Sequence, residues 1–90
     1  NVAKEIGLVN AIFPSEMLLE ECEKLGKKIL KNGPIAVRES IFSINKGLDL
    51  PLEEGLDQEA EKFGNIFRSQ DQKEGTLAFI EKRSPDFKGK

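Results

Sequence analysis

Apolar residues recur in the middle of the chain at the spacing that gives an α-helix one apolar face. In the segment 15–31 this apolar stripe consists of Leu18, Cys22, Leu25 and Ile29. Glutamates gather at the start of the segment and lysines at its end, as the helix dipole favours. Ser15 is the expected N-terminal cap, and Asn32 or Gly33 is expected at positive φ where the helix stops. The pattern therefore predicts one long helix.

The same spacing predicts three further helices. The next one is expected to begin with Pro34, which suits the first helical position. Its apolar stripe is Val37, Ile41, Ile44 and Leu48. A third helix is expected to start near Pro51, with an apolar side made of Leu52, Leu56, Ala60, Phe63 and Phe67. Ser69 and Gln72 match the Ser-x-x-Gln pattern of a capping box, which predicts a fourth helix that runs to about Arg83.

The N-terminal segment carries a different pattern. Ala3–Ile6 is typical of the last turn of a helix, and Gly7 stands where a left-handed residue usually stops one. Leu8–Phe13 is mostly apolar on both faces and is predicted to form a strand that Pro14 closes. No second strand is expected elsewhere, so this strand would leave its backbone groups unpaired.

The expected fold is therefore mainly α, with one N-terminal orphan strand followed by about four helices. A strand of this kind needs a sheet at its edges, so we interpret the chain as the C-terminal piece of a larger α/β protein. Two alternatives stay open: the strand is a mobile arm, or it pairs with the same strand of a second copy. Residues 84–90 are expected to form a polar tail, because Pro85 cannot extend the last helix.

Composition and charge exclude several kinds of partner. The 90 residues are 38% apolar and 33% charged, and their net charge of -2 gives no basic field for nucleic acid or an anionic membrane. No apolar run approaches the roughly 18 residues that a membrane span requires. With no histidine and one cysteine, the chain lacks the ligands of a nitrogen- or sulfur-rich metal site. No targeting segment is readable, and we expect a cytoplasmic protein.

The residues do not assemble a catalytic centre. A nucleophilic triad needs a base beside a serine or cysteine, but histidine is absent and Cys22 is expected in the core. The eight glycines are scattered, whereas a phosphate-binding loop needs them clustered. Two acidic pairs, Glu53/Glu54 and Glu59/Glu61, are expected on solvated helix surfaces. No catalytic residue and no metal site is predicted.

Phe79 and Lys82 form the one pair that invites a functional interpretation. They lie three positions apart and so share one face of the last predicted helix. An aromatic ring beside an ammonium can stack on a planar base and pair with a phosphate. The simpler alternative is structural: Phe79 packs in a core or interface, and Lys82 is a cation at a helix C-terminus.

Three motifs along the chain resemble a known family. They are A-K-x-x-G-L-V at 3–9, I-N-K-G at 44–47 and D-x-x-E-G-x-x-A-F-x-E-K-R-x-P-x-F-K-G at 71–89. In these motifs the chain resembles the C-terminal third of the crotonase superfamily, the enoyl-CoA hydratase/isomerase proteins. Within that family it is most similar to short-chain enoyl-CoA hydratases and 3-hydroxybutyryl-CoA dehydratases.

The resemblance implies a division of the chain. Residues 1–14 would be the end of the crotonase core, an α/β spiral of sheet and helices, and would comprise a helix end and the predicted strand. Residues 15–83 would form a helical C-terminal region used for oligomerisation, and residues 84–90 a tail. The resemblance also implies a homo-oligomer, either a trimer or a hexamer.

The activity implied by the resemblance is the hydration of a 2-enoyl-CoA thioester, so an acyl-CoA is the expected substrate and no tightly bound cofactor is implied. In the family, two backbone N–H groups hold the thioester oxygen and two glutamates activate the water, all upstream of Asn1. No residue of this chain is therefore implied as catalytic, and the 90 residues alone are expected to be inactive. The resemblance does imply that Phe79 and Lys82 reach the adenine and 3′-phosphate end of CoA.

Two alternatives of other classes stay open. One is a non-catalytic helical oligomerisation module, and the other is a small acyl-carrier or acyl-CoA-binding bundle. A carrier needs a serine attachment site such as Asp-Ser at a helix start, and the chain has no Asp-Ser pair. Acyl-CoA-binding bundles use tyrosine contacts, and the chain has no tyrosine.

Overall fold

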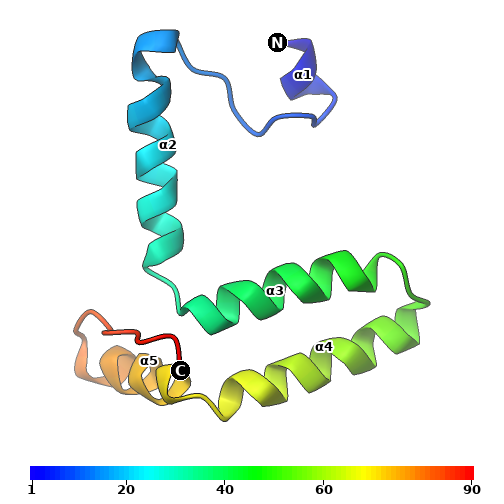
Figure 1. Ribbon diagram of the computed structural model, residues 1–90, viewed down its shortest axis with the longest axis vertical. Helices are drawn as coiled ribbons and strands as arrows, with labels where there is room; N and C mark the ends of the chain where they lie inside the picture. Colours follow the sequence, from blue (N-terminus) through cyan, green and yellow to red (C-terminus); the bar gives the residue numbers. More distant parts are fainter.

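The computed structural model describes all 90 residues as helices connected by irregular links (Figure 1). The helices are α1 (Val2–Glu5), α2 (Ser15–Leu30), α3 (Pro34–Gly47), α4 (Leu52–Phe67) and α5 (Gln70–Glu81). The long helices α2–α5 confirm the predicted ones, and α3 begins at Pro34 as expected. None of these helices is both long and apolar enough to cross a membrane.

The N-terminal segment forms a short helix and an irregular link. α1 ends as predicted, because Gly7 has a φ of 76° and the N–H of Leu8 donates to the Ala3 carbonyl at 2.8 Å. The predicted strand at Leu8–Phe13 is wrong, since this part of the chain has no regular structure. A strand exists only within a hydrogen-bonded ladder, and no other segment supplies backbone partners to residues 10–13.

The ends of α2 differ from the sequence-based expectation. Pro14, with φ -54° and ψ 146°, occupies the N-cap position, so Ser15 is the first helical residue and makes no capping bond. Neither Asn32 nor Gly33 has a positive φ. The Asn32 side chain instead donates from Nδ2 to the Lys28 carbonyl at 3.1 Å. A side-chain hydrogen bond therefore replaces the expected left-handed stop.

α3 and α4 lie side by side and antiparallel, and they form the most closely packed part of the chain (Figure 1). Lys62 of α4 pairs with Glu39 of α3 at 3.2 Å and stands 4.3 Å from the centroid of the Phe42 ring. The two helices approach closely where Gly55 faces Gly47. A Cβ placed on Gly55 would lie 3.7 Å from the Gly47 Cα, an ordinary van der Waals contact, so the two backbones come close together here.

The remaining shape of the chain is open. Its radius of gyration is 16.8 Å, whereas a compact domain of this length has about 12 Å. The accessible surface is 7617 Å², against about 5,200 Å² for a compact protein of this mass. Ala78 and Asp71 are the only buried residues. The helices therefore build no common core within these 90 residues.

The apolar stripe of α2 shows most clearly that the helices lack a common core. Leu25 is 55% exposed and Ile29 is 49% exposed, because α2 packs closely against no other helix. Cys22 was expected in a core, and this prediction is wrong for the chain, since its thiol is exposed along the same uncovered stripe. The stripe is free to contact protein surface from outside these residues.

Candidate functional site

The candidate site lies at the C-terminal end of α5. The N-terminal end of the same helix is capped by a side chain. The Ser69 hydroxyl accepts a hydrogen bond from the Gln72 N–H at 3.1 Å, which confirms the predicted cap. The reciprocal half of the capping box does not form, because Gln72 Nε2 donates instead to the Thr76 hydroxyl at 3.0 Å. α5 is the one helix of the chain whose N-cap side chain bonds its first turn.

The end of α5 is a left-handed turn at Lys82. The helix stops at Glu81 and not at Arg83, since Lys82 has φ 55° and ψ 43°. The Arg83 N–H donates to the Ala78 carbonyl at 3.0 Å, and the Lys82 N–H donates to the Phe79 carbonyl at 3.3 Å. This pair of bonds is the Schellman arrangement that usually employs glycine. A lysine in this conformation costs about 1 kcal/mol or more, so other contacts must hold it.

The structure brings the two residues predicted from the sequence to the same end of α5. Phe79 belongs to the last turn and is 85% exposed. Lys82 is exposed, forms no ion pair, and lies just beyond the helix instead of on its face. The arrangement offers an open aromatic ring and an unpaired ammonium at one helix end, which suits a planar base with an adjoining anionic group.

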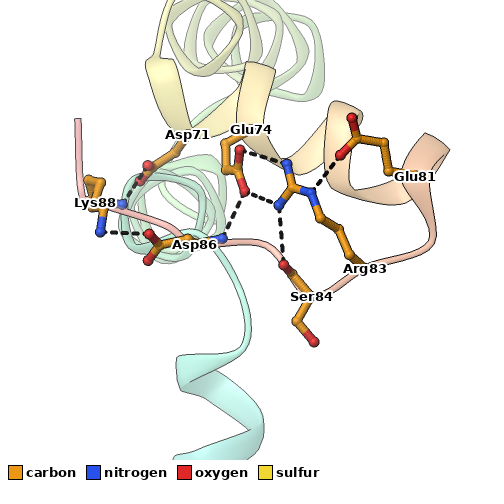
Figure 2. A network of polar contacts seen from close by, with 7 residues as sticks. All are labelled: Asp71, Glu74, Glu81, Arg83, Ser84, Asp86 and Lys88. Carbon is orange, nitrogen blue, oxygen red and sulfur yellow. Dashed lines mark hydrogen bonds and ion pairs between the residues drawn. The ribbon is translucent and has the colours of Figure 1, made fainter.

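Arg83 is the centre of a polar network directly after Lys82 (Figure 2). Its Nη1 and Nη2 atoms bind the two oxygens of Glu74 at 2.5 and 3.1 Å, and its Nε binds Glu81 at 2.6 Å. Glu74 also accepts the N–H of Asp86 at 2.9 Å. The guanidinium and this carboxylate thus form a bidentate pair, the strongest kind of side-chain ion pair.

The network shifts the proton affinities of its members. The hydrogen bonds from Arg83, and after them the bond from the Asp86 N–H, lower the pKa of Glu74 from 4.5 to about 2. The Glu74 carboxylate in turn raises the pKa of Arg83 above its ordinary value. Both groups therefore stay charged through the neutral pH range.

The segment after Arg83 folds back along α5. Asp71, which is 5% exposed, accepts the N–H groups of Lys88 and Gly89 at 2.7 Å each. The ring of Phe87 lies against α5, where a Cβ on Gly75 would be 3.2 Å from Phe87 Cε1. We call Asp71, Glu74, Arg83 and the segment 84–90 the C-terminal clasp. The segment expected as a polar tail is therefore fastened to the helix.

The clasp residues Asp71, Glu74 and Arg83 did not emerge from sequence reasoning. Glu74 and Arg83 are nine positions apart, which is no helical contact spacing, and only the left-handed turn brings them together. The available signal was the third motif, in which all three residues stand at defined positions within 71–89.

Comparisons with known proteins agree on one family. The sequence profile described as Enoyl-CoA hydratase/isomerase matches residues 1–90. The crotonyl-CoA hydratase of Syntrophomonas wolfei subsp. wolfei is 44% identical over 85 residues, which are 94% of this chain and 33% of that protein. The short-chain-enoyl-CoA hydratase of Clostridioides difficile is 44% identical over 77 residues, which are 86% of this chain and 50% of that protein.

A crystal structure contains the same arrangement of helices. The enoyl-CoA hydratase from Bacillus anthracis superposes with a TM-score of 0.93 at 40% identity, over 98% of this chain and 34% of that one. The chain spans about a third of the length of the Syntrophomonas and Bacillus proteins, and the matched third is their C-terminal helical part. Since the family profile covers all 90 residues, the chain belongs to the enoyl-CoA hydratase/isomerase family.

Proposed function

We propose that this chain is the C-terminal part of an enoyl-CoA hydratase-like lyase, which adds water to the double bond of a 2-enoyl-CoA thioester. The match of all 90 residues to the family, over about a third of the hydratase relatives, carries this proposal. The oxyanion hole and the two glutamates of the reaction would belong to the part before Asn1. The acyl-CoA is the substrate, no tightly bound cofactor is proposed, and no residue of this chain has a catalytic role.

Within that enzyme the helices would supply packing between subunits of a trimer or a hexamer. The support is the open shape of the chain, whose apolar stripes remain exposed on α2, α3 and α4. Exposed stripes of this extent are typical of surfaces that another protein surface covers. The proposed location is the cytoplasm, where the free thiol of Cys22 stays reduced.

Phe79 and Lys82 would contact the nucleotide end of the substrate, with the ring on the adenine and the ammonium on the 3′-phosphate. The exposure of Phe79 and the absence of any ion pair at Lys82 support this role. A hydrogen bond between a lysine and a phosphate contributes roughly 1.5–3 kcal/mol in favourable geometry. The contact is the same in the ground state and the transition state, so it would act on KM and not on kcat.

The test replaces Lys82 in the natural polypeptide that carries this chain. Lys82→Ala is expected to raise KM for crotonyl-CoA about tenfold or more while kcat changes little. Lys82→Arg keeps the charge and should restore most of the affinity. Lys73→Ala is the matched control, since Lys73 is an exposed lysine of α5 that forms no ion pair. A loss of kcat at unchanged KM, or an equal effect of the control, would contradict the assignment.

Crotonyl-CoA also serves to test the reaction itself. The natural polypeptide should hydrate it, as the names of the matched relatives suggest, and the isolated 90 residues should not. A polypeptide that neither binds CoA nor hydrates crotonyl-CoA would contradict the proposal. It would favour the alternative of a non-catalytic helical assembly module. The exposed apolar stripes are consistent with that alternative too.

A further inference from the structure

The C-terminal clasp fixes the orientation of Arg83, the residue that directly follows Lys82 (Figure 2). Two oxygens of Glu74 and one of Glu81 hold the guanidinium at 2.5, 3.1 and 2.6 Å. A planar guanidinium bound through both of its ends has a defined orientation, whereas an ammonium at the same place could rotate. The backbone of Lys82 is therefore held between helix α5 on one side and Arg83 on the other.

Lys82 needs such support because its conformation is unusual. It is the only non-glycine residue of the chain with a positive φ. After the turn the chain returns to α5, where Asp86 donates its N–H to Glu74 at 2.9 Å. Without the ion pair the turn would relax toward right-handed or extended conformations, and the lysine side chain would leave the backbone in another direction.

The same network occupies acidic groups of α5 and of the segment that returns to it. Glu74 and Glu81 bind Arg83, and Asp86 binds the ammonium of Lys88 at 2.7 Å. Lys82 forms no ion pair in spite of these carboxylates. Its ammonium is thus available to an anion from outside the chain, at the end of α5 that also carries the exposed ring of Phe79.

We propose that Arg83 and Glu74 are positioning residues for Lys82. Their ion pair holds the left-handed turn in the geometry in which the Lys82 ammonium and the Phe79 ring meet a phosphate monoester that adjoins a purine. This inference rests on the proposed function of Phe79 and Lys82 and adds the device that sets their geometry. Neither Arg83 nor Glu74 touches the ligand, and both act through the backbone of Lys82.

The experiment uses the natural polypeptide and two substrates, crotonyl-CoA and crotonyl-pantetheine, which lacks the nucleotide. Arg83→Lys keeps the charge but cannot bind both oxygens of Glu74 in a fork. We expect it to raise KM for crotonyl-CoA roughly fivefold at unchanged kcat and to leave crotonyl-pantetheine unaffected. Glu74→Gln, which preserves the shape of the side chain, should act in the same direction. Arg68→Lys, at an exposed arginine outside the clasp, is the matched control.

A double variant shows whether Arg83 acts through Lys82. In the Lys82→Ala background, Arg83→Lys should raise KM no further, because the group that it positions is gone. Effects that multiply in the double variant would overturn the inference. So would an equal loss on both substrates, since that result indicates general damage to the fold. Melting temperatures identify such damage, and Glu74→Gln carries the test if Arg83→Lys proves unstable.

The two proposals fail in different ways. If Lys82→Ala and Phe79→Ala leave KM for crotonyl-CoA unchanged, the proposed function of this pair is wrong, and the positioning role falls with it. If these variants raise KM but Arg83→Lys and Glu74→Gln do not, only the positioning role is wrong.

Discussion

Glu74 is the residue of the C-terminal clasp that binds both Arg83 and the backbone of Asp86. Its carboxylate accepts the fork of Arg83 and the N–H of Asp86, so one side chain connects α5, the left-handed turn and the returning segment. Such a carboxylate is stabilised in its charged form by every one of its partners. The contacts that Glu74 makes within the clasp should therefore weaken when this carboxylate takes up a proton.

We expect the clasp to be intact at neutral pH and to open in strong acid. Because the pKa of Glu74 is lowered from 4.5 to about 2, its contacts stabilise the folded state above pH 4.5, and this contribution is lost as the pH falls toward 2. The NMR chemical shift of the Asp86 N–H should titrate with a midpoint near 2. Glu74→Gln should abolish this titration, and a midpoint near 4.5 would contradict the bidentate pair.

Single residues also show where sequence reasoning fails. The left-handed stop at Gly7 was predictable, because glycine takes this conformation at little cost. The equivalent turn at Lys82 was not, because a lysine adopts it only when distant contacts compensate the cost. The roles of Arg83 and Glu74 were hidden for the same reason, since their contact exists only after the turn has formed.

Among the helices, α5 is the one whose stability depends on a side-chain cap at its N-terminus. Ser69→Ala should lower the free energy of unfolding by about 1 kcal/mol, because the Gln72 N–H loses its acceptor. Denaturation followed by circular dichroism at one protein concentration measures the change. Ser15→Ala is the matched control and should stay within about 0.5 kcal/mol, since Ser15 makes no capping bond. Equal losses at both positions would show that the Ser69 bond is not responsible.

The long helices could be predicted, whereas the strand could not. Each of α2 to α5 combines an apolar stripe with local signals at its ends, such as Pro34 and Ser69, and these signals act within a few residues. A strand needs a partner at its edge, and no segment of this chain forms a strand ladder with Leu8–Phe13. The apolar pattern of this segment is typical of a strand, but the partner that a strand requires is absent from these 90 residues.

At the scale of the whole molecule, the open shape makes stability depend on concentration. We expect the isolated chain to self-associate through its apolar stripes, so that its apparent melting temperature rises with protein concentration. Sedimentation velocity at several concentrations measures the association. Leu25→Gln should weaken it, because this side chain is 55% exposed on the stripe of α2. Lys27→Gln, on the same helix outside the stripe, should not, and a monomer at all concentrations would contradict the expectation.

The left-handed turn also affects the susceptibility of the chain to proteolytic cleavage. Lys82 and Arg83 are adjacent basic residues, and trypsin-like enzymes cleave after residues of this kind when they bind them in an extended form. In the folded chain the Arg83 guanidinium is engaged by carboxylates, and the backbone at Lys82 is curled. Cleavage must therefore wait for a local opening, and its rate follows the population of the open form. A dibasic sequence normally indicates a peptide bond that such proteases cleave readily. Here the conformation of the chain protects that bond.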